Sequence, residues 1–290
     1  MTLFIGSLQL GLIYGFLAIG IYISFRIMNI PDLTAEGSFT FGLVVAAVFA
    51  DLGHPILGIV LALAAGALAG VVTGALNVYL RIPAILAGIL TMSGLYSVNL
   101  LTMDSKANLT LIGVDIDLAK TLVNLVLVAL AVFLIYTFFK TRIGLSIRAT
   151  GDNEYMVRAS SINIGVTKIL ALALSNAIIA LSGGILAQYQ QFADISSGVG
   201  MLVVGLASVI IGEAFLGQRG ILCGLCAAVL GSIIYRLLIA LAYQTNIFPS
   251  AAFRLISAVI VTIALAIPAI KQLLDMQRKR KENLRDAHVD

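Results

Sequence analysis

The chain has 290 residues, of which 60% are hydrophobic and 11% are charged, and its formal net charge is +4. Soluble domains carry roughly 45–50% apolar and about 25% charged residues. The composition therefore excludes an ordinary soluble fold and predicts an all-α polytopic membrane protein, because lipid must be the solvent for much of this apolar surface. We expect no nucleic-acid partner.

Apolar runs of about 20 residues predict about nine transmembrane helices within a membrane domain of residues 1–270. The first charged residue is Arg26, so the first run lacks the basic start of a signal peptide and is expected to stay as a helix. The second run is short and follows the polar segment 29–37, which predicts one broken helix at membrane depth. The predicted spans lie near 3–25, 38–51, 55–80, 84–103, 118–139, 168–190, 199–216, 220–243 and 252–270.

Basic residues concentrate in the loop 140–168 and in the tail 271–290. Because basic connections stay on the cytoplasmic side, we place the loop and the C-terminus in the cytoplasm and the N-terminus outside, with the chain in the inner or plasma membrane. The outer connections then carry acidic residues, which form either solvated loop ends or a docking rim for an extracytoplasmic partner. These residues are Asp51, Asp104, Asp115, Asp117 and Asp194.

A weak internal repeat relates residues 32–58 to residues 194–222. Each copy begins with an Asp-led polar segment, continues as an apolar run and ends in a glycine-containing turn. Five predicted spans separate the copies, so they enter the membrane in opposite directions. Inverted repeats of this kind flank the central site of many transporters.

The chain lacks the motifs of an enzyme or a metal protein. It contains no Gly-x-x-x-x-Gly-Lys-Ser/Thr phosphate loop, no His-Glu-x-x-His and no Gly-x-Ser-x-Gly. Cys223 and Cys226 lie in one apolar run, far from either histidine, and are expected to be inert packing thiols. We therefore expect no catalytic residue, no metal site and no cofactor in this chain.

Ionisable and polar residues near membrane depth are costly and therefore mark candidate sites. We assign Asp32, Thr34 and Glu36, at the predicted break, and Glu213 to a translocation path, because broken backbone and buried polar groups can bind a solute. A structural alternative is that Asp32 or Thr34 caps the following helix, with Glu36 near its positive end. Glu213 is also a candidate partner for Arg236.

A glycine stripe, Gly66-x-x-x-Gly70-x-x-x-Gly74, places small residues on one face of a predicted helix. Such a face lets a second helix approach closely. We expect it to serve internal packing rather than a seam between two chains.

The loop 140–168 is the most distinctive segment. Residues 152–161 predict a short amphipathic helix that begins at Asp152 or Asn153 as N-cap. Its polar and apolar side chains suit either docking into the groove of a partner or lying on the membrane surface.

At this loop the chain resembles a known family. The segments Gly144-Leu-Ser-Ile-Arg-Ala-Thr-Gly-Asp-Asn153 and Leu181-Ser-Gly-Gly-Ile-Leu-Ala187 are similar to permeases of ABC importers in the branched-chain amino acid (LivH/LivM) and ribose-type superfamily. Gly11-Leu-Ile-Tyr-Gly-Phe-Leu-Ala-Ile-Gly20 and Gly217-Gln-Arg-Gly-Ile-Leu-Cys-Gly224 look like its first and later stretches. Ser161 replaces a glycine usual in the family. The segment Asp32-Leu-Thr-Ala-Glu-Gly37 looks more like a subgroup of Gram-positive aromatic amino acid permeases.

The resemblance implies an ATP-driven importer of a small polar solute and favours an aromatic or branched-chain amino acid. It implies a homodimer with a second permease copy, both embedded in membrane lipid. It also implies a cytoplasmic ABC ATPase dimer that binds ATP and Mg²⁺, and an extracytoplasmic solute-binding protein. The loop helix becomes the coupling helix, carried onto Asp152, Asn153, Glu154, Tyr155 and Arg158. A ribose- or nucleoside-type permease and, less favoured, an ion-coupled secondary transporter are the alternatives.

Overall fold

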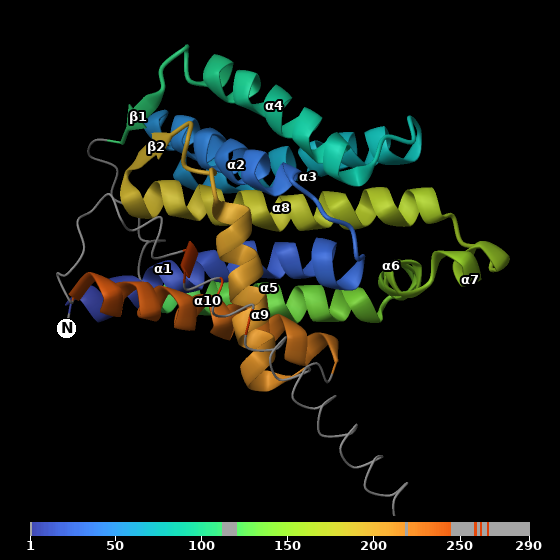
Figure 1. Ribbon diagram of the computed structural model, residues 1–290. Helices are drawn as coiled ribbons and strands as arrows, with labels where there is room; N and C mark the ends of the chain where they lie inside the picture. Colours follow the sequence, from blue (N-terminus) through green and yellow to red (C-terminus); the bar gives the residue numbers. More distant parts are fainter. Residues whose placement is uncertain are drawn as a thin grey trace, which may run out of the picture.

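The structure is a computed structural model and describes residues 2–111, 121–217, 220–244, 258, 259, 262 and 266. Helices dominate it (Figure 1). They are α1 (Thr2–Ile21), the π-helical η1 (Tyr22–Ile27), α2 (Thr34–Asp51), α3 (Pro55–Val78), α4 (Ala84–Thr102), α5 (Thr121–Lys140), α6 (Arg142–Asp152), α7 (Glu154–Ala159), α8 (Ile164–Gln190), α9 (Met201–Leu216) and α10 (Ile221–Gln244). The strands β1 (Asn108–Thr110) and β2 (Phe192–Asp194) pair antiparallel.

The all-α polytopic membrane fold is confirmed. Within the described residues, seven helices are long and apolar enough to cross a membrane, counting α1 with η1 as one. Eight of the predicted spans coincide with helices, although α9, with 16 residues, is shorter than a full span. The predicted span 252–270 and the basic tail 271–290 lie almost wholly outside the described residues.

The bundle has two distinct ends, between which α8 runs as a central helix packed against α1, α2 and α3 (Figure 1). The helices α6 and α7 lie beyond one end, which we call the α6–α7 end. The small sheet lies at the other, which we call the β1–β2 end. Since α5 leads into α6 and α7 leads into α8, the segment between these two long helices projects from the bundle.

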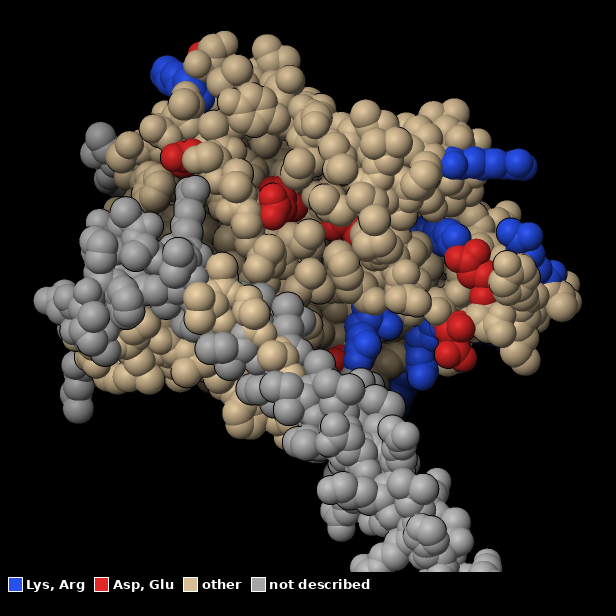
Figure 2. Space-filling view, in the orientation of Figure 1, with Lys and Arg blue, Asp and Glu red and all other residues tan. Residues whose placement is uncertain are grey.

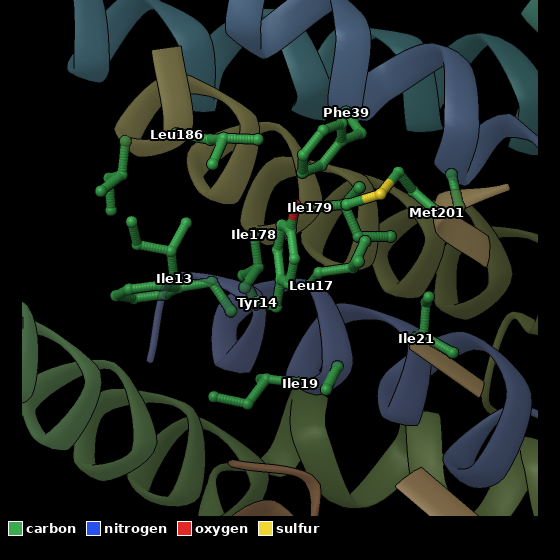
Figure 3. Packing of buried hydrophobic residues seen from close by; sticks show 14 of the residues in the cluster. Ile13, Tyr14, Leu17, Ile19, Ile21, Phe39, Ile178, Ile179, Leu186 and Met201 are labelled. Carbon is green, nitrogen blue, oxygen red and sulfur yellow. The ribbon is translucent and has the colours of Figure 1, made fainter. Parts of the chain in front are cut away.

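Apolar side chains face both inward and outward, as expected for a protein whose solvent is lipid. In the core, Ile13, Tyr14 and Leu17 of α1 point toward Phe39 of α2 and Ile178 of α8 (Figure 3). On the outside, large apolar side chains remain exposed along α3, α4 and α5; examples are Leu68, Leu101, Leu122 and Phe133.

The glycine stripe of α3 packs against α8, which confirms its expected internal role. A Cβ at Gly66 would overlap the carbonyl oxygen of Asn176, and one at Gly70 would overlap that of Leu172. The two backbones therefore touch directly, a contact that only a residue without a side chain permits.

The predicted break is present and lies inside the bundle. Residues 28–33 are not helical, and they join η1 to α2. Asp32 is only 1% exposed and meets Asn176 near the middle of the 27-residue α8. The break is thus buried in protein, the setting in which irregular backbone is tolerated at this depth. The inverted repeat stays a prediction, although both copies contain a polar turn, a helix and a glycine at positive φ, Gly53 or Gly217.

Candidate functional site

The segment between α5 and α8 forms two helices rather than the single predicted one. The Oγ1 atom of Thr141 accepts a hydrogen bond from the Gly144 N–H at 3.3 Å and caps α6. The Oδ1 atom of Asn153 accepts one from the Met156 N–H at 3.1 Å and caps α7. Of the two predicted caps, Asn153 is therefore the one used, while Asp152 ends α6.

Contacts at its base hold α7 in place, and its tip is free of the rest of the described chain. Val157 is buried, and the Glu154 carboxylate forms an ion pair with Lys168 of α8 at 2.5 Å. Tyr155 and Met156 are 85% and 73% exposed, although both are large and partly apolar. A short helix that presents such side chains beyond the bundle is a typical docking element.

The base of this segment also touches the break. The Oγ1 atoms of Thr150 in α6 and Thr167 in α8 are 3.0 Å apart. A Cβ at Gly151 would overlap the carbonyl oxygen of Ile27, so the end of α6 lies directly on the end of η1. Movement of α6 and α7 therefore has a direct contact through which to reach η1 and the chain leading to Asp32.

At the break, Asp32 and Thr34 belong to a buried polar network. The Asp32 Oδ1 accepts from the Thr34 N–H at 2.9 Å and Oδ2 from the Asn176 Nδ2 at 2.6 Å. The Thr34 hydroxyl lies 2.7 Å from that of Thr73, which donates to Thr91 at 2.9 Å. Leu33 is the N-cap residue of α2, and Asp32, one position earlier, accepts from the first amide of the helix, which is close to the capping alternative. The assignment of Asp32 and that of Thr34 to the path stay predictions.

A cavity of about 900 Å³ opens near the α6–α7 end. Polar side chains from η1, the break, α6 and α9 line it, among them Arg26, Asn29, Arg148, Asp152 and Glu213. The structure thus brings two predicted site residues, Asp152 and Glu213, to one cavity, although they come from different predicted groups.

The partner of Glu213 is Arg26, not Arg236. The Arg26 Nε and Nη2 donate to the two carboxylate oxygens of Glu213 at 2.7 and 2.9 Å. Arg236 instead lies over the ring of Tyr14, with its guanidinium carbon 4.2 Å from the ring centroid. The candidate Glu213–Arg236 pair is therefore not the one formed, and the observed pair ties η1 to α9.

Reversing this ion pair provides a first test of the geometry. We expect Glu213→Gln to lower the thermal midpoint of the purified protein by roughly 2 °C, because a partly exposed bidentate pair contributes up to about 1 kcal/mol. The double variant Arg26→Glu/Glu213→Arg should recover most of that loss. Because the protein has no tryptophan, its thermal midpoint is measured by static light scattering. A double variant with a lower midpoint than both single variants would contradict a direct pair.

A second cavity, of about 440 Å³, lies toward the β1–β2 end between α2, α4 and the turn after β2. Glu36 belongs to its wall, together with Thr40, Tyr96 and Asn99. The Glu36 Oε1 accepts a hydrogen bond from the Gly200 N–H at the start of α9, at 3.0 Å. Glu36 was predicted from the sequence, whereas Tyr96 and Asn99 were not, although Asn99 stands out as a lone amide in an apolar run.

No group of three or more His, Cys, Asp or Glu side chains that could hold a metal lies within the described part of the chain. Cys223 and Cys226 are free thiols, and the Cys223 thiol points toward the carbonyl oxygen of Leu216 at 3.5 Å.

Comparison with known proteins places this architecture among transport proteins. Residues 3–265 match the family model described as "Branched-chain amino acid transport system / permease component". The chain is 36% identical over 260 residues to the tyrosine transport system permease protein of Clostridioides difficile (strain R20291), covering 88% of both chains. It is 34% identical to an uncharacterised protein of Rickettsia prowazekii (strain Madrid E) over 224 residues, 73% of this chain and 78% of the relative.

A more distant relative is the autoinducer 2 import system permease protein LsrC of Escherichia coli (strain K12 / DH10B). The identity is 31% over 175 residues, 58% of this chain and 50% of the relative. No solved structure matches. The family model covers almost the whole chain, so the chain belongs to the branched-chain amino acid transport system permease family and is the permease component of an ABC transporter, not itself an enzyme.

Proposed function

We propose that this permease imports an aromatic α-amino acid and that α7 is the helix through which its ATPase drives transport. The tyrosine permease of Clostridioides difficile supports the solute class, because its likeness extends over 88% of both chains. The single observation that carries the coupling assignment is the projecting tip of α7, where Tyr155 and Met156 are exposed beyond the bundle while Val157 anchors the helix.

The distribution of charge supports an orientation with the α6–α7 end in the cytoplasm. Figure 2 shows Lys and Arg gathered at the end where Figure 1 shows α6 and α7. Connections and helix ends on that side carry Arg81, Lys140, Arg142, Arg148, Arg158 and Lys168. Those at the β1–β2 end carry Asp51, Asp104 and Asp194, with Lys106 as the basic exception.

In this orientation the partners take definite places. The ATPase dimer meets α7, and a solute-binding protein docks at the β1–β2 end, where the acidic side chains lie. A second copy of the permease completes the path. Asn153 starts the coupling helix, the Glu154–Lys168 ion pair holds it to α8, and Tyr155 and Arg158 face the ATPase.

The contact between α6 and η1 suggests how a movement of α7 is transmitted to the break. When ATP binding closes the ATPase dimer, the two α7 helices move with it. Gly151 lies against the Ile27 carbonyl, so this motion acts on η1 and on the Arg26–Glu213 pair before it reaches the break. Helices around the break then rock, and access to the central path alternates.

Trimming the tip of α7 tests the coupling assignment. We expect Tyr155→Ala combined with Met156→Ala to lower solute-stimulated ATPase activity of the reconstituted complex at least tenfold, because the buried centre of a docking surface carries most of its binding energy. Tyr79→Ala is the matched control, since Tyr79 is 73% exposed at the C-terminus of α3, near the same end of the bundle, and should retain coupled activity.

The variants should remain folded, because the two truncated side chains make little contact with their own chain. Co-purification with the ATPase measures docking, and uptake into vesicles measures transport. Full coupled activity of the double variant would refute the assignment. Uptake that continues with an ATPase-dead partner and collapses with the proton gradient would instead indicate an ion-coupled transporter.

A further inference from the structure

The cavity toward the β1–β2 end has two chemically different walls. Met92, Ile195 and Val199 provide apolar surface, and Tyr96 adds an aromatic ring. Glu36, Thr40 and Asn99 supply polar atoms. A volume of about 440 Å³ lies in the range of small-molecule sites, which combine an apolar lining with a few placed polar groups.

Close packing fixes the shape of the cavity. A Cβ at Gly198 would overlap both the Glu36 carbonyl oxygen and the Thr40 hydroxyl, so the turn after β2 lies directly on α2. The same turn is held by the Asp194 carboxylate, whose Oδ1 accepts from the Ser196 N–H at 2.6 Å. The wall opposite α4 is therefore preorganised rather than a loose loop.

Glu36 supplies the charge of this site. Its Oε1 accepts from the Gly200 N–H at 3.0 Å, which fixes the carboxylate at the start of α9. Among the described residues, no Lys or Arg forms an ion pair with Glu36, and none lines the cavity. A carboxylate that lines a cavity without a neighbouring cation favours a positively charged ligand.

Asn99 provides a second and independent indication. It is 1% exposed, it belongs to the cavity wall, and its Oδ1 accepts no hydrogen bond within the described structure. Buried amide oxygens nearly always have a donor, and a missing one requires an explanation. This oxygen has almost no exposed surface, so a donor-rich group in the cavity would satisfy it once the amide turns toward the cavity.

We propose that this cavity is a solute-binding site of the permease that takes a primary ammonium group together with an apolar or aromatic body. Glu36 and the Asn99 amide oxygen receive the ammonium hydrogens, and Tyr96, Met92 and Val199 cover the body. The site selects for the ammonium and not for a carboxylate, because none of the described residues in its walls is basic. This inference rests on the proposed function and adds that the permease itself discriminates among solutes.

Three probes that differ only in their charged groups test it. They are tyramine, which has the ammonium alone, L-tyrosine, which has both groups, and 3-(4-hydroxyphenyl)propionate, which has the carboxylate alone. Binding is measured by saturation-transfer NMR on the permease–ATPase complex in nanodiscs, without the solute-binding protein. Tyramine and tyrosine should bind, and the propionate should bind at least about tenfold more weakly, since a charge-assisted hydrogen bond contributes that much.

Two substitutions locate the site. Glu36→Gln keeps an acceptor for the Gly200 N–H but removes the charge, so it should weaken tyramine binding about tenfold. Asn99→Leu should weaken it several-fold, whereas the matched control Asn124→Leu should not. Asn124 is also fully buried and its amide atoms have no partner, but it lies on α5 outside the cavity.

Equal binding of the propionate, unchanged tyramine binding in Glu36→Gln, or no binding of any probe would each overturn the inference. ATP-driven uptake by the same complex in vesicles is followed in parallel. If uptake requires ATP but Glu36→Gln binds tyramine as well as the parent protein does, only this binding site is rejected. Uptake that does not require ATP would reject the proposed function.

Discussion

Gly42→Ala should sharply reduce the amount of correctly folded permease, although it adds only one methyl group. Gly42 of α2 faces α8, and a Cβ there would overlap the carbonyl oxygen of Ala180. The contact is reciprocal, because a Cβ at Gly183 of α8 would overlap the carbonyl oxygen of Phe39. Since both obstacles are helix backbone, no side-chain rotation relieves the clash and the two helices must separate.

Separating α2 from α8 would open the core at its centre and displace the break that precedes α2. Overpacking of this kind costs about 1–3 kcal/mol or more, against a total stability of only about 5–15 kcal/mol. We expect the monodisperse fraction of a fluorescent-protein fusion, measured by size-exclusion chromatography after expression, to fall at least about tenfold.

Gly94→Ala is the matched control for this substitution. Gly94 also lies inside a helix, α4, but a Cβ there meets nothing within 4 Å. Alanine is favoured over glycine in helices by roughly 1 kcal/mol, so this variant should be neutral or slightly more stable. Normal folding of Gly42→Ala would show that α2 and α8 do not touch as described.

Elements that depend on local sequence were predicted well. Long apolar runs mark the spanning helices, because a lipid-facing helix must be apolar along its whole length. The polar segment 29–37 marks the break, and Asn153 marks the start of α7 through its capping side chain. In each case the deciding property lies within a few neighbouring residues.

The separate helix α6 was not predicted from the sequence, for a physical reason. Gly144 and Gly151 weaken its intrinsic helix propensity by about 1 kcal/mol each. Both positions are in backbone contact, Gly144 with Phe138 and Gly151 with Ile27. Tertiary packing therefore selects residues here that local propensity disfavours.

The site depends on contacts between residues that are far apart in the chain. Arg26 and Glu213 are separated by 187 positions, and Asp32 and Asn176 by 144. Both Arg26 and Glu213 stand out in the sequence as charges near the membrane, but nothing in a single sequence says which charges meet. Asn176 gives no comparable signal, since one amide in a long apolar helix has several structural uses.

Asp32→Ala should lower the thermal midpoint of the purified permease by at least ~5 °C, the second large effect that we expect. It removes the acceptor of the Thr34 N–H at the start of α2 and that of the Asn176 amide at the centre of α8. Each buried donor left without an acceptor costs about 1–3 kcal/mol. Asp32→Asn should cost less, because its remaining oxygen still accepts from Thr34.

A double-mutant cycle shows whether the loss of stability in Asp32→Ala comes from its hydrogen bond to Asn176. Asn176 also donates to the Leu172 carbonyl, an interaction within α8 at 3.0 Å, so Asn176→Ala removes this bond as well as the one to Asp32. In Asp32→Ala/Asn176→Ala both partners of the Asp32–Asn176 bond are absent, and the combined loss should be smaller than the sum of the two single losses. Strict additivity would argue against the bond.

The same variants separate the two roles considered for Asp32. If its carboxylate serves only to join α2 to α8, transport per folded molecule should stay near that of the parent protein in Asp32→Asn, while stability falls. If the carboxylate contacts the solute, transport should fall in Asp32→Asn with little change in the thermal midpoint. Because both carboxylate oxygens already accept hydrogen bonds from protein donors, the first outcome is the one that the geometry favours.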